Sequence, residues 1–160
     1  MSMGRRDITM TPEEAHNFLE AGRTLMVASI GKQGAPHLVP MFYVIEDGNP
    51  VFRSFTKSQK IVNLKRDPRV TVLVEEGNAY TELQGVLIEG RARLIDDPDY
   101  VLALYGRLAA KYPVVGDHPV HLDSAQLQAA FGRYAPKNTA VVVEPTKVMT
   151  WDHRKLQGAY

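Results

Sequence analysis

The sequence contains no cysteine, which excludes disulfides, thiolate catalysis and cysteine-ligated metals. It has no apolar run of about 18 residues, so we expect no membrane span. The net charge is only +1, and acids are interspersed with the basic residues, which gives no electrostatic footprint for nucleic acid. Residues 1–10 lack the apolar segment of a secretory signal, and the expectation is a cytoplasmic protein.

A chain of 160 residues is long enough to bury a core of its own. We expect a single domain over residues 1–160, with 1–10 as a flexible N-terminal segment. Thr11-Pro12-Glu13-Glu14 predicts a helix start with a capping box, and Gly22 is placed to end that helix.

Strand candidates alternate with turn signals along most of the remaining chain. Their ranges are 24–30, 37–45, 51–55, 70–74, 80–95, 139–143 and 147–151. Asp47-Gly48-Asn49 predicts a hairpin, and Glu144-Pro145-Thr146 predicts a turn between the last two strands. Gly90, inside the longest candidate, indicates a bulge or a bend of a barrel strand.

Two further helices interrupt the strands. Asp97-Pro98 opens a helix that runs to Tyr112, and another is predicted over 124–134 after a loop at 113–121. There is no βαβ alternation and no GxGxxG or GxxxxGK[ST] motif, which excludes nucleotide-binding folds of those types. The pattern predicts a mainly β protein with helices (α+β), an antiparallel β-barrel of six or seven strands.

The most informative stretch is Val51–Arg69, VFRSFTKSQKIVNLKRDPR, which predicts a strand, a polar cluster and a short helix. Seven polar side chains fall within eight positions: Arg53, Ser54, Thr56, Lys57, Ser58, Gln59 and Lys60. Hydroxyls and amines at a helix N-terminus suit a phosphate, because the first N–H groups there are unpaired. The alternative is a solvated loop before a surface helix.

Three segments together resemble the split-barrel flavin and deazaflavin oxidoreductase superfamily, which includes pyridoxamine 5′-phosphate oxidase. They are VFRSFTKSQKIVNLKRDPRVTVLV, ELQGVLIEGRARL and VMTWDHRKL. TKSQKxxNLxRDPR and WDHRKL are most similar to actinobacterial proteins that bind the deazaflavin coenzyme F420. The resemblance spans about Thr11 to Leu156. It implies an FMN-binding-like split β-barrel and a homodimer with cofactor sites at the subunit interface. It also implies a small-molecule substrate and neither a nucleic-acid nor a membrane partner.

The resemblance assigns cofactor-binding positions to Pro40, Met41, Phe42, Ser54, Lys57, Ser58, Gln59, Lys60, Gln84 and Trp151. Residues 40–42 would run along the ring, and Ser54 with residues 58–60 would hold the phosphate. Gln84 matches a glutamine that reaches the cofactor from the partner subunit, and Trp151 matches an aromatic position near the ring.

Departures from the FMN oxidases favour F420 as the cofactor. Those enzymes often carry an arginine at the position of Gln59, for which Lys57 could partly substitute. They also carry cations near His37 and Phe42 that this chain lacks. The implied activity is hydride transfer between deazaflavin and a small unsaturated or quinone-like acceptor. Two alternatives stay open, an FMN-binding oxidase-like flavoprotein and a non-catalytic binder of cofactor or haem.

Catalytic residues are not identified by the sequence. Tyr43, His153 and water are equally open as the proton donor, and the segment 112–134 either covers the site or leaves it open. His118 and His121 are too few ligands for a metal, and we expect none.

Overall fold

The computed structural model describes residues 8–156, and most of the segment predicted to be flexible lies outside them. The helices are α1 (Pro12–Ala21), α2 (Gln59–Arg66), α3 (Pro98–Lys111) and α4 (Ser124–Phe131). The strands are β1 (Leu25–Ile30), β2 (Pro36–Met41), β3 (Val44–Glu46), β4 (Asn49–Phe55), β5 (Arg69–Glu76), β6 (Gln84–Ile95) and β7 (Asn138–Asp152).

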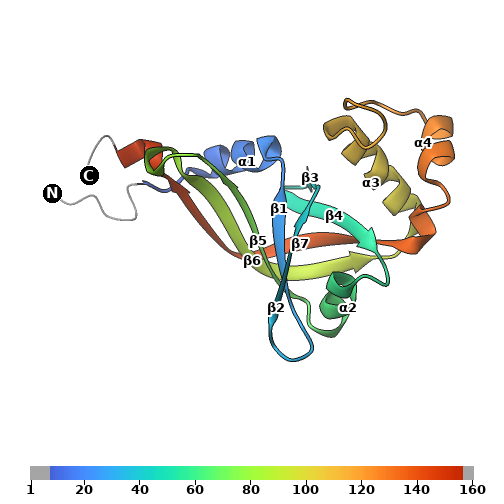
Figure 1. The fold of residues 1–160 in the computed structure, drawn as a ribbon, viewed down its shortest axis with the longest axis horizontal. Coiled ribbons are helices and arrows are strands. Elements are labelled where there is room, and N and C mark those ends of the chain that lie inside the picture. The colour runs from blue at the N-terminus through green and yellow to red at the C-terminus, as the bar shows by residue number, and fades with distance from the viewer. Residues whose placement is uncertain (1–7, 157–160) are drawn as a thin grey trace.

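The seven strands form one antiparallel sheet in the order β2-β1-β5-β6-β7-β4-β3. Figure 1 shows β5, β6 and β7 curving out as a long arm, with α1 beside it and α2 and the α3–α4 pair toward the other end. This half-barrel with helices confirms the predicted α+β split barrel. The capping box of Thr11 and Glu14 and the Asp97 cap are also confirmed.

The predicted turn at residues 144–146 is wrong, because β7 runs without interruption from Asn138 to Asp152. The register with β6 shifts between Glu89 and Gly90, which confirms the bulge predicted at Gly90. A Cβ on Gly90 would lie 2.5 Å from the Glu144 carbonyl oxygen, so glycine allows this close approach. Pro145 is tolerated within the strand because the bulge interrupts the regular ladder beside it.

The predicted strand over 37–45 is also wrong in part, because it divides into β2 and β3 around Phe42 and Tyr43. Tyr43 is fully buried, and the Tyr112 hydroxyl bonds its backbone, donating to the carbonyl oxygen at 3.0 Å and accepting from the N–H at 3.3 Å. The Tyr112 side chain, at the end of α3, therefore makes the backbone hydrogen bonds that a neighbouring strand would otherwise make. The other boundary errors are smaller, since β6 begins only at Gln84 and α4 ends at Phe131.

The hairpin predicted at residues 47–49 is present, and Asp47 and Gly48 both have positive φ, as type I′ turns require. Beyond it, β4 separates two apolar clusters. Val51 packs with α3 in one cluster, while Phe52 packs in the barrel interior in the other. Adjacent strand residues point to opposite faces, so β4 presents two different surfaces.

Candidate functional site

The polar cluster predicted after β4 comes together in the structure through three side chains. The Ser54 Oγ lies 3.0 Å from the Ser58 Oγ, and the Lys60 Nζ donates to the Ser54 Oγ at 3.1 Å. Ser58 is the N-cap residue of α2, yet its hydroxyl makes no capping bond to the helix backbone. The cluster thus combines two hydroxyls, an ammonium and a helix N-terminus.

The positive charge of Lys60 has no counter-charge among residues 8–156. Partial burial lowers the pKa of Lys60, and no carboxylate of residues 8–156 pairs with it. A half-buried ammonium without an acid is suited to receive an anion from outside the chain.

The other two predicted residues of this loop are placed differently. The Gln59 Nε2 donates to the Asn63 Oδ1 at 2.8 Å, which directs this amide along its own helix. Asn63 is fully buried and donates in turn to the Ser29 Oγ at 3.1 Å. Lys57 is exposed to solvent. Ser54, Ser58 and Lys60 are therefore brought together, whereas Gln59 supports the helix.

A cavity of about 610 Å³ adjoins this cluster at Ser54. Its lining residues are Arg23, Thr24, Pro40, Met41, Phe42, Arg53, Ser54, Phe55, Leu108 and Val114. All three residues predicted to run along the ring, 40–42, thus line one cavity together with the predicted phosphate-binding Ser54. Val114 shows that the segment after α3 contributes to the wall, which answers in part the question left open for residues 112–134.

Two cations of this cavity, Arg23 and Arg53, were not among the predicted cofactor-binding residues, although Arg53 was counted in the polar cluster. The Arg53 guanidinium lies 4.0 Å from the centre of the Tyr105 ring, and its Nη1 donates to the Asn138 Oδ1 at 3.1 Å. Its Nε is buried without a hydrogen-bond partner, and burial lowers the pKa of Arg53. An arginine inside an otherwise apolar strand was the signal that could have identified it.

Two aromatic residues, Phe42 and Phe55, line the cavity. Phe42 stacks on Tyr112 with 4.1 Å between ring centres and 15° between planes. Tyr43 is directed away from the cavity, because its hydroxyl donates to the Leu19 carbonyl oxygen, and burial raises its pKa. His153 packs against Tyr80. Neither of the two side chains considered as proton donors lines the cavity.

Gln84 and Trp151 lie on the arm, away from the cavity. They stand on the paired strands β6 and β7, at the arm end that Figure 1 places opposite α2. The Trp151 indole packs over Gly85, where an added Cβ would come within 2.1 Å of it. One chain by itself does not bring these two residues to the other eight.

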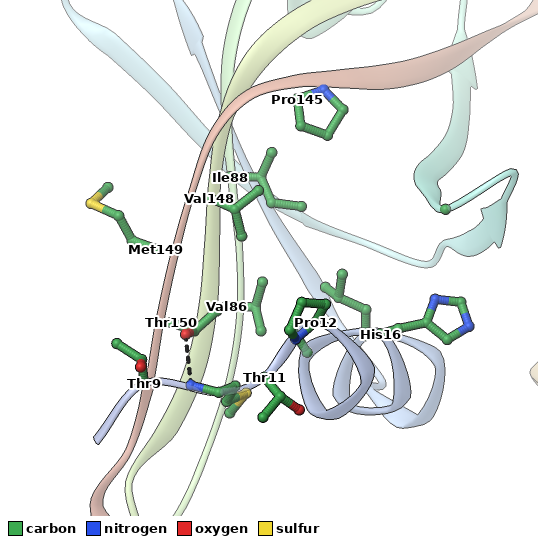
Figure 2. A pocket seen from close by; sticks show the side chains of 14 residues that line it. Thr9, Thr11, Pro12, His16, Val86, Ile88, Pro145, Val148, Met149 and Thr150 are labelled. Atoms are coloured by element: carbon green, nitrogen blue, oxygen red, sulfur yellow. Dashed lines mark hydrogen bonds between the residues drawn. The ribbon is translucent and has the colours of Figure 1, made fainter. Parts of the chain in front are cut away.

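A larger cavity of about 780 Å³ lies between α1 and the arm. Figure 2 shows Val86, Ile88 and Val148 along one side and Pro12 with His16 on the other. The Met10 N–H donates to the Thr150 Oγ1 at 2.9 Å and closes one end. The lining is mainly apolar and holds none of the predicted site residues.

Within residues 8–156, no three His, Asp or Glu side chains gather as metal ligands would. His118 and His121 are both exposed. No helix in the same range is long and apolar enough to cross a membrane.

Comparison with known proteins gives a family and a set of similar folds. The family profile described as pyridoxamine 5′-phosphate oxidase matches residues 11–152. A conserved hypothetical protein from Mycobacterium tuberculosis is 33% identical over 97% of this chain and 92% of that chain, with a TM-score of 0.86. No curated protein matches the chain.

Two more distant solved structures share the fold. One, named as an F420 reductase, is 22% identical over 87% of this chain and 98% of that chain, with a TM-score of 0.66. The other is a FAD-binding protein from Mesorhizobium loti, 20% identical over 89% of this chain and 94% of that chain, with a TM-score of 0.61.

Proposed function

This chain belongs to the pyridoxamine 5′-phosphate oxidase family, and from that premise we propose that it is an oxidoreductase dependent on coenzyme F420. The observation that carries the proposal is the cluster of Ser54, Ser58 and Lys60 beside the cavity lined by residues 40–42. The substrate would be a small unsaturated or quinone-like acceptor. When bound, the deazaflavin supplies a hydride from its C5 atom to an electron-poor double bond.

The phosphate of the cofactor is assigned to the polar cluster. Lys60 supplies a charge without a partner acid, and the hydroxyls of Ser54 and Ser58 supply donors at the start of α2. Each hydrogen bond to a charged group contributes about 1.5–3 kcal/mol in proteins, so these contacts suffice for specific binding.

The ring system is assigned to the adjoining cavity. Pro40, Met41 and Phe42 give it an apolar wall, which excludes water from a hydride donor. The strand β2 lies at the edge of the sheet, where Pro40 has no N–H to contribute to a ladder. The edge backbone is thus free of a further strand and accessible to a planar ligand.

F420 is favoured over FMN by the low number of cations around the phosphate cluster. Only Lys60 is directed into it, since Gln59 bonds Asn63 and Lys57 points to solvent. The structurally similar F420 reductase and FAD-binding protein show that this fold accommodates either type of cofactor. The alternative is a flavoprotein of the FMN oxidase type.

A homodimer that completes two cofactor sites is part of the proposal. The register aligns an apolar row across five strands, Pro40, Met26, Leu73, Leu87 and Met149. These side chains belong to neither core cluster and are at least partly exposed. A second copy covering this row is the simplest way to bury it. The partner would then also supply Gln84 and Trp151.

The test is a parallel titration of purified protein with F420 and FMN, followed by cofactor fluorescence. Tight F420 binding with weak FMN binding supports the proposal. Preferential FMN binding assigns the chain to the flavin-dependent alternative. Absence of binding to both cofactors would leave the polar cluster as a solvated loop and overturn the assignment. A haem absorption band in the purified protein would point instead to the non-catalytic binder.

A further inference from the structure

Arg53 is a partly buried cation for which residues 8–156 provide no anion. No carboxylate of residues 8–156 forms an ion pair with it, and its one hydrogen-bond acceptor is the neutral Asn138 amide. Its Nε is buried and unpaired. Proteins rarely bury an arginine without a counter-charge, because the loss of hydration is not recovered. The arrangement indicates that a ligand supplies the missing charge.

The guanidinium is held rigidly in place for such a ligand. Tyr105 supports its flat face at 4.0 Å, and Asn138 fixes Nη1. A planar guanidinium restrained in this way offers its remaining donors as a fork, which matches the two oxygens of a carboxylate.

This ligand differs from the cofactor phosphate, because the two cation sites lie on opposite faces of β4. Ser54 faces Lys60 on α2, whereas Arg53, its neighbour, faces Tyr105 on α3. A single phosphate held by Lys60 does not satisfy Arg53 as well. Arg53 and Ser54 both line the cavity but direct their side chains to opposite faces of β4, so two anionic groups are needed to satisfy Lys60 and Arg53.

The remaining walls of the cavity describe the rest of the ligand. Phe42, Leu108 and Val114 are apolar, and Arg23 adds a second cation at the same cavity. Its volume of about 610 Å³ falls in the range of small-molecule sites, and the acid would share it with the ring assigned to residues 40–42. A small organic acid with an unsaturated or aromatic body fits both the charges and the walls.

We propose that the hydride acceptor of this protein is an organic acid, whose carboxylate Arg53 binds in the cavity beside the cofactor. That the acid accepts a hydride rests on the proposed function, whereas the binding of an acid at Arg53 does not depend on it. Arg53 is thereby a specificity-determining residue, which selects acids over neutral molecules of the same shape.

The test compares naphthoate with naphthamide, which share a ring and differ in charge, by calorimetric titration of the full chain. Wild-type protein should bind naphthoate at least about tenfold more tightly. Arg53→Gln should abolish the preference, and Arg53→Lys should retain only part of it, because an ammonium lacks the fork. Arg91→Gln changes an exposed arginine of β6. It is the matched control and should behave as wild type.

F420 titrations of the same variants separate this proposal from the previous one. Loss of acid preference in Arg53→Gln with unchanged F420 affinity supports the acid site. An intact preference in a protein that does not bind F420 supports the acid site and contradicts only the proposed function. Equal affinity of wild type for naphthoate and naphthamide overturns the acid site. An equal loss of F420 and naphthoate affinity in Arg53→Gln also overturns it. If Arg53→Gln does not fold by circular dichroism, the Arg53→Lys comparison decides.

Discussion

At the scale of single residues, Lys60 and Arg53 share a property that governs ligand binding. They lie on either side of β4. Each is a partly buried cation with no ion-paired acid in the described part of the chain, and burial lowers the pKa of each. Charge of this kind is costly in the free protein and is compensated when an anion binds. Ligand binding should therefore depend strongly on these two positions.

Replacement of Lys60 by alanine should weaken F420 binding by about 1–3 kcal/mol, because one charged hydrogen bond to the phosphate is lost. Fluorescence titration measures the change. Lys65→Ala, at the exposed end of the same helix, is the control and should leave affinity unchanged. Equal affinities of wild type and Lys60→Ala would remove the phosphate from this cluster.

The same lysine predicts a pH dependence of binding. Burial lowers its pKa below the ordinary 10.5, so the ammonium is lost as the pH rises through that lowered value. F420 affinity should accordingly fall at a pH below 10.5, and the fall should be absent in Lys60→Ala. A fall of the same size in both proteins would assign it to another group.

Tyr112 predicts an effect on stability rather than on binding. In Tyr112→Phe the buried N–H and C=O groups of Tyr43 lose their partner, at a cost of about 1–3 kcal/mol in the free energy of unfolding. Urea denaturation measures it. Tyr134→Phe, whose hydroxyl bonds only the exposed Arg133 among described residues, should change stability much less.

At the residue scale, the sequence predicts contacts between residues that are close together in the chain. Ser54, Ser58 and Lys60 meet because a strand end and a helix start are close in the chain. The guanidinium of Arg53, in contrast, is positioned by contacts with Tyr105 and Asn138, which are far away in sequence. The sequence shows an arginine within a strand, but long-range packing of that kind leaves no local pattern, so the contacts of Arg53 with Tyr105 and Asn138 could not be predicted.

Among the elements, the join between α2 and β5 carries a pH-sensitive contact. Hydrogen bonds from Arg69 hold the pKa of the Asp67 carboxyl at about 2. A carboxyl with a lowered pKa stabilises the fold at neutral pH, and this contribution is lost as the pH falls from about 4 toward 2. The join should thus loosen in acid.

Asp67→Asn should lower the urea midpoint slightly at neutral pH, and the difference from wild type should disappear near pH 2. Arg69 is exposed and Asp67 is partly exposed, so the effect is small and is weakened by salt. Asp117→Asn, in the exposed loop after α3, serves as the control. A difference that persists unchanged at pH 2 would rule out the ionised pair as its cause.

Packing between β6 and β7 gives a prediction with an optical measurement. Gly85→Ala would place a methyl group 2.1 Å from the Trp151 ring, which must then move. We expect a loss of about 1–3 kcal/mol in stability, with a shift in the fluorescence of the sole tryptophan. Gly106→Ala, in α3, would meet only the Leu127 methyl groups of α4 at 3.4 Å and should be neutral or stabilising.

Elements with a clear local signal were predicted well, and those decided by distant partners were not. The cap at Thr11, the hairpin at 47–49 and the bulge at Gly90 all follow from residue chemistry. Glu144-Pro145-Thr146 has turn chemistry too, but pairing with β6 overrides it. The break at Tyr43 is stabilised by a residue 69 positions away, which periodicity does not reveal.

For the whole molecule, the proposed dimer makes the apolar row across five strands the feature to test. Leu87→Glu places a charge in the middle of that row, and desolvating it would cost more than the contact returns. Sedimentation should show wild type at twice 17.9 kDa and the variant at 17.9 kDa. Val62→Glu, on an equally apolar but separate position of α2, should stay dimeric.

A monomeric wild type would contradict the dimer and with it the roles of Gln84 and Trp151. The resemblance placed these two residues beside the ring, and a single chain holds them on the arm instead. The antiparallel split barrel itself follows from strand and turn patterns. A site shared between copies cannot be derived from the pattern of one chain, because its parts meet only after assembly.

The sheet edge at β2 also bears on how readily separate copies of the chain would aggregate. Residues 36, 38 and 40 direct their nitrogens to the open side of the edge, and two of the three are prolines without an N–H. An edge with so few donors is a poor template for adding strands from neighbouring chains. The two prolines therefore lower the tendency of this edge to aggregate, although Leu38 between them is 60% exposed.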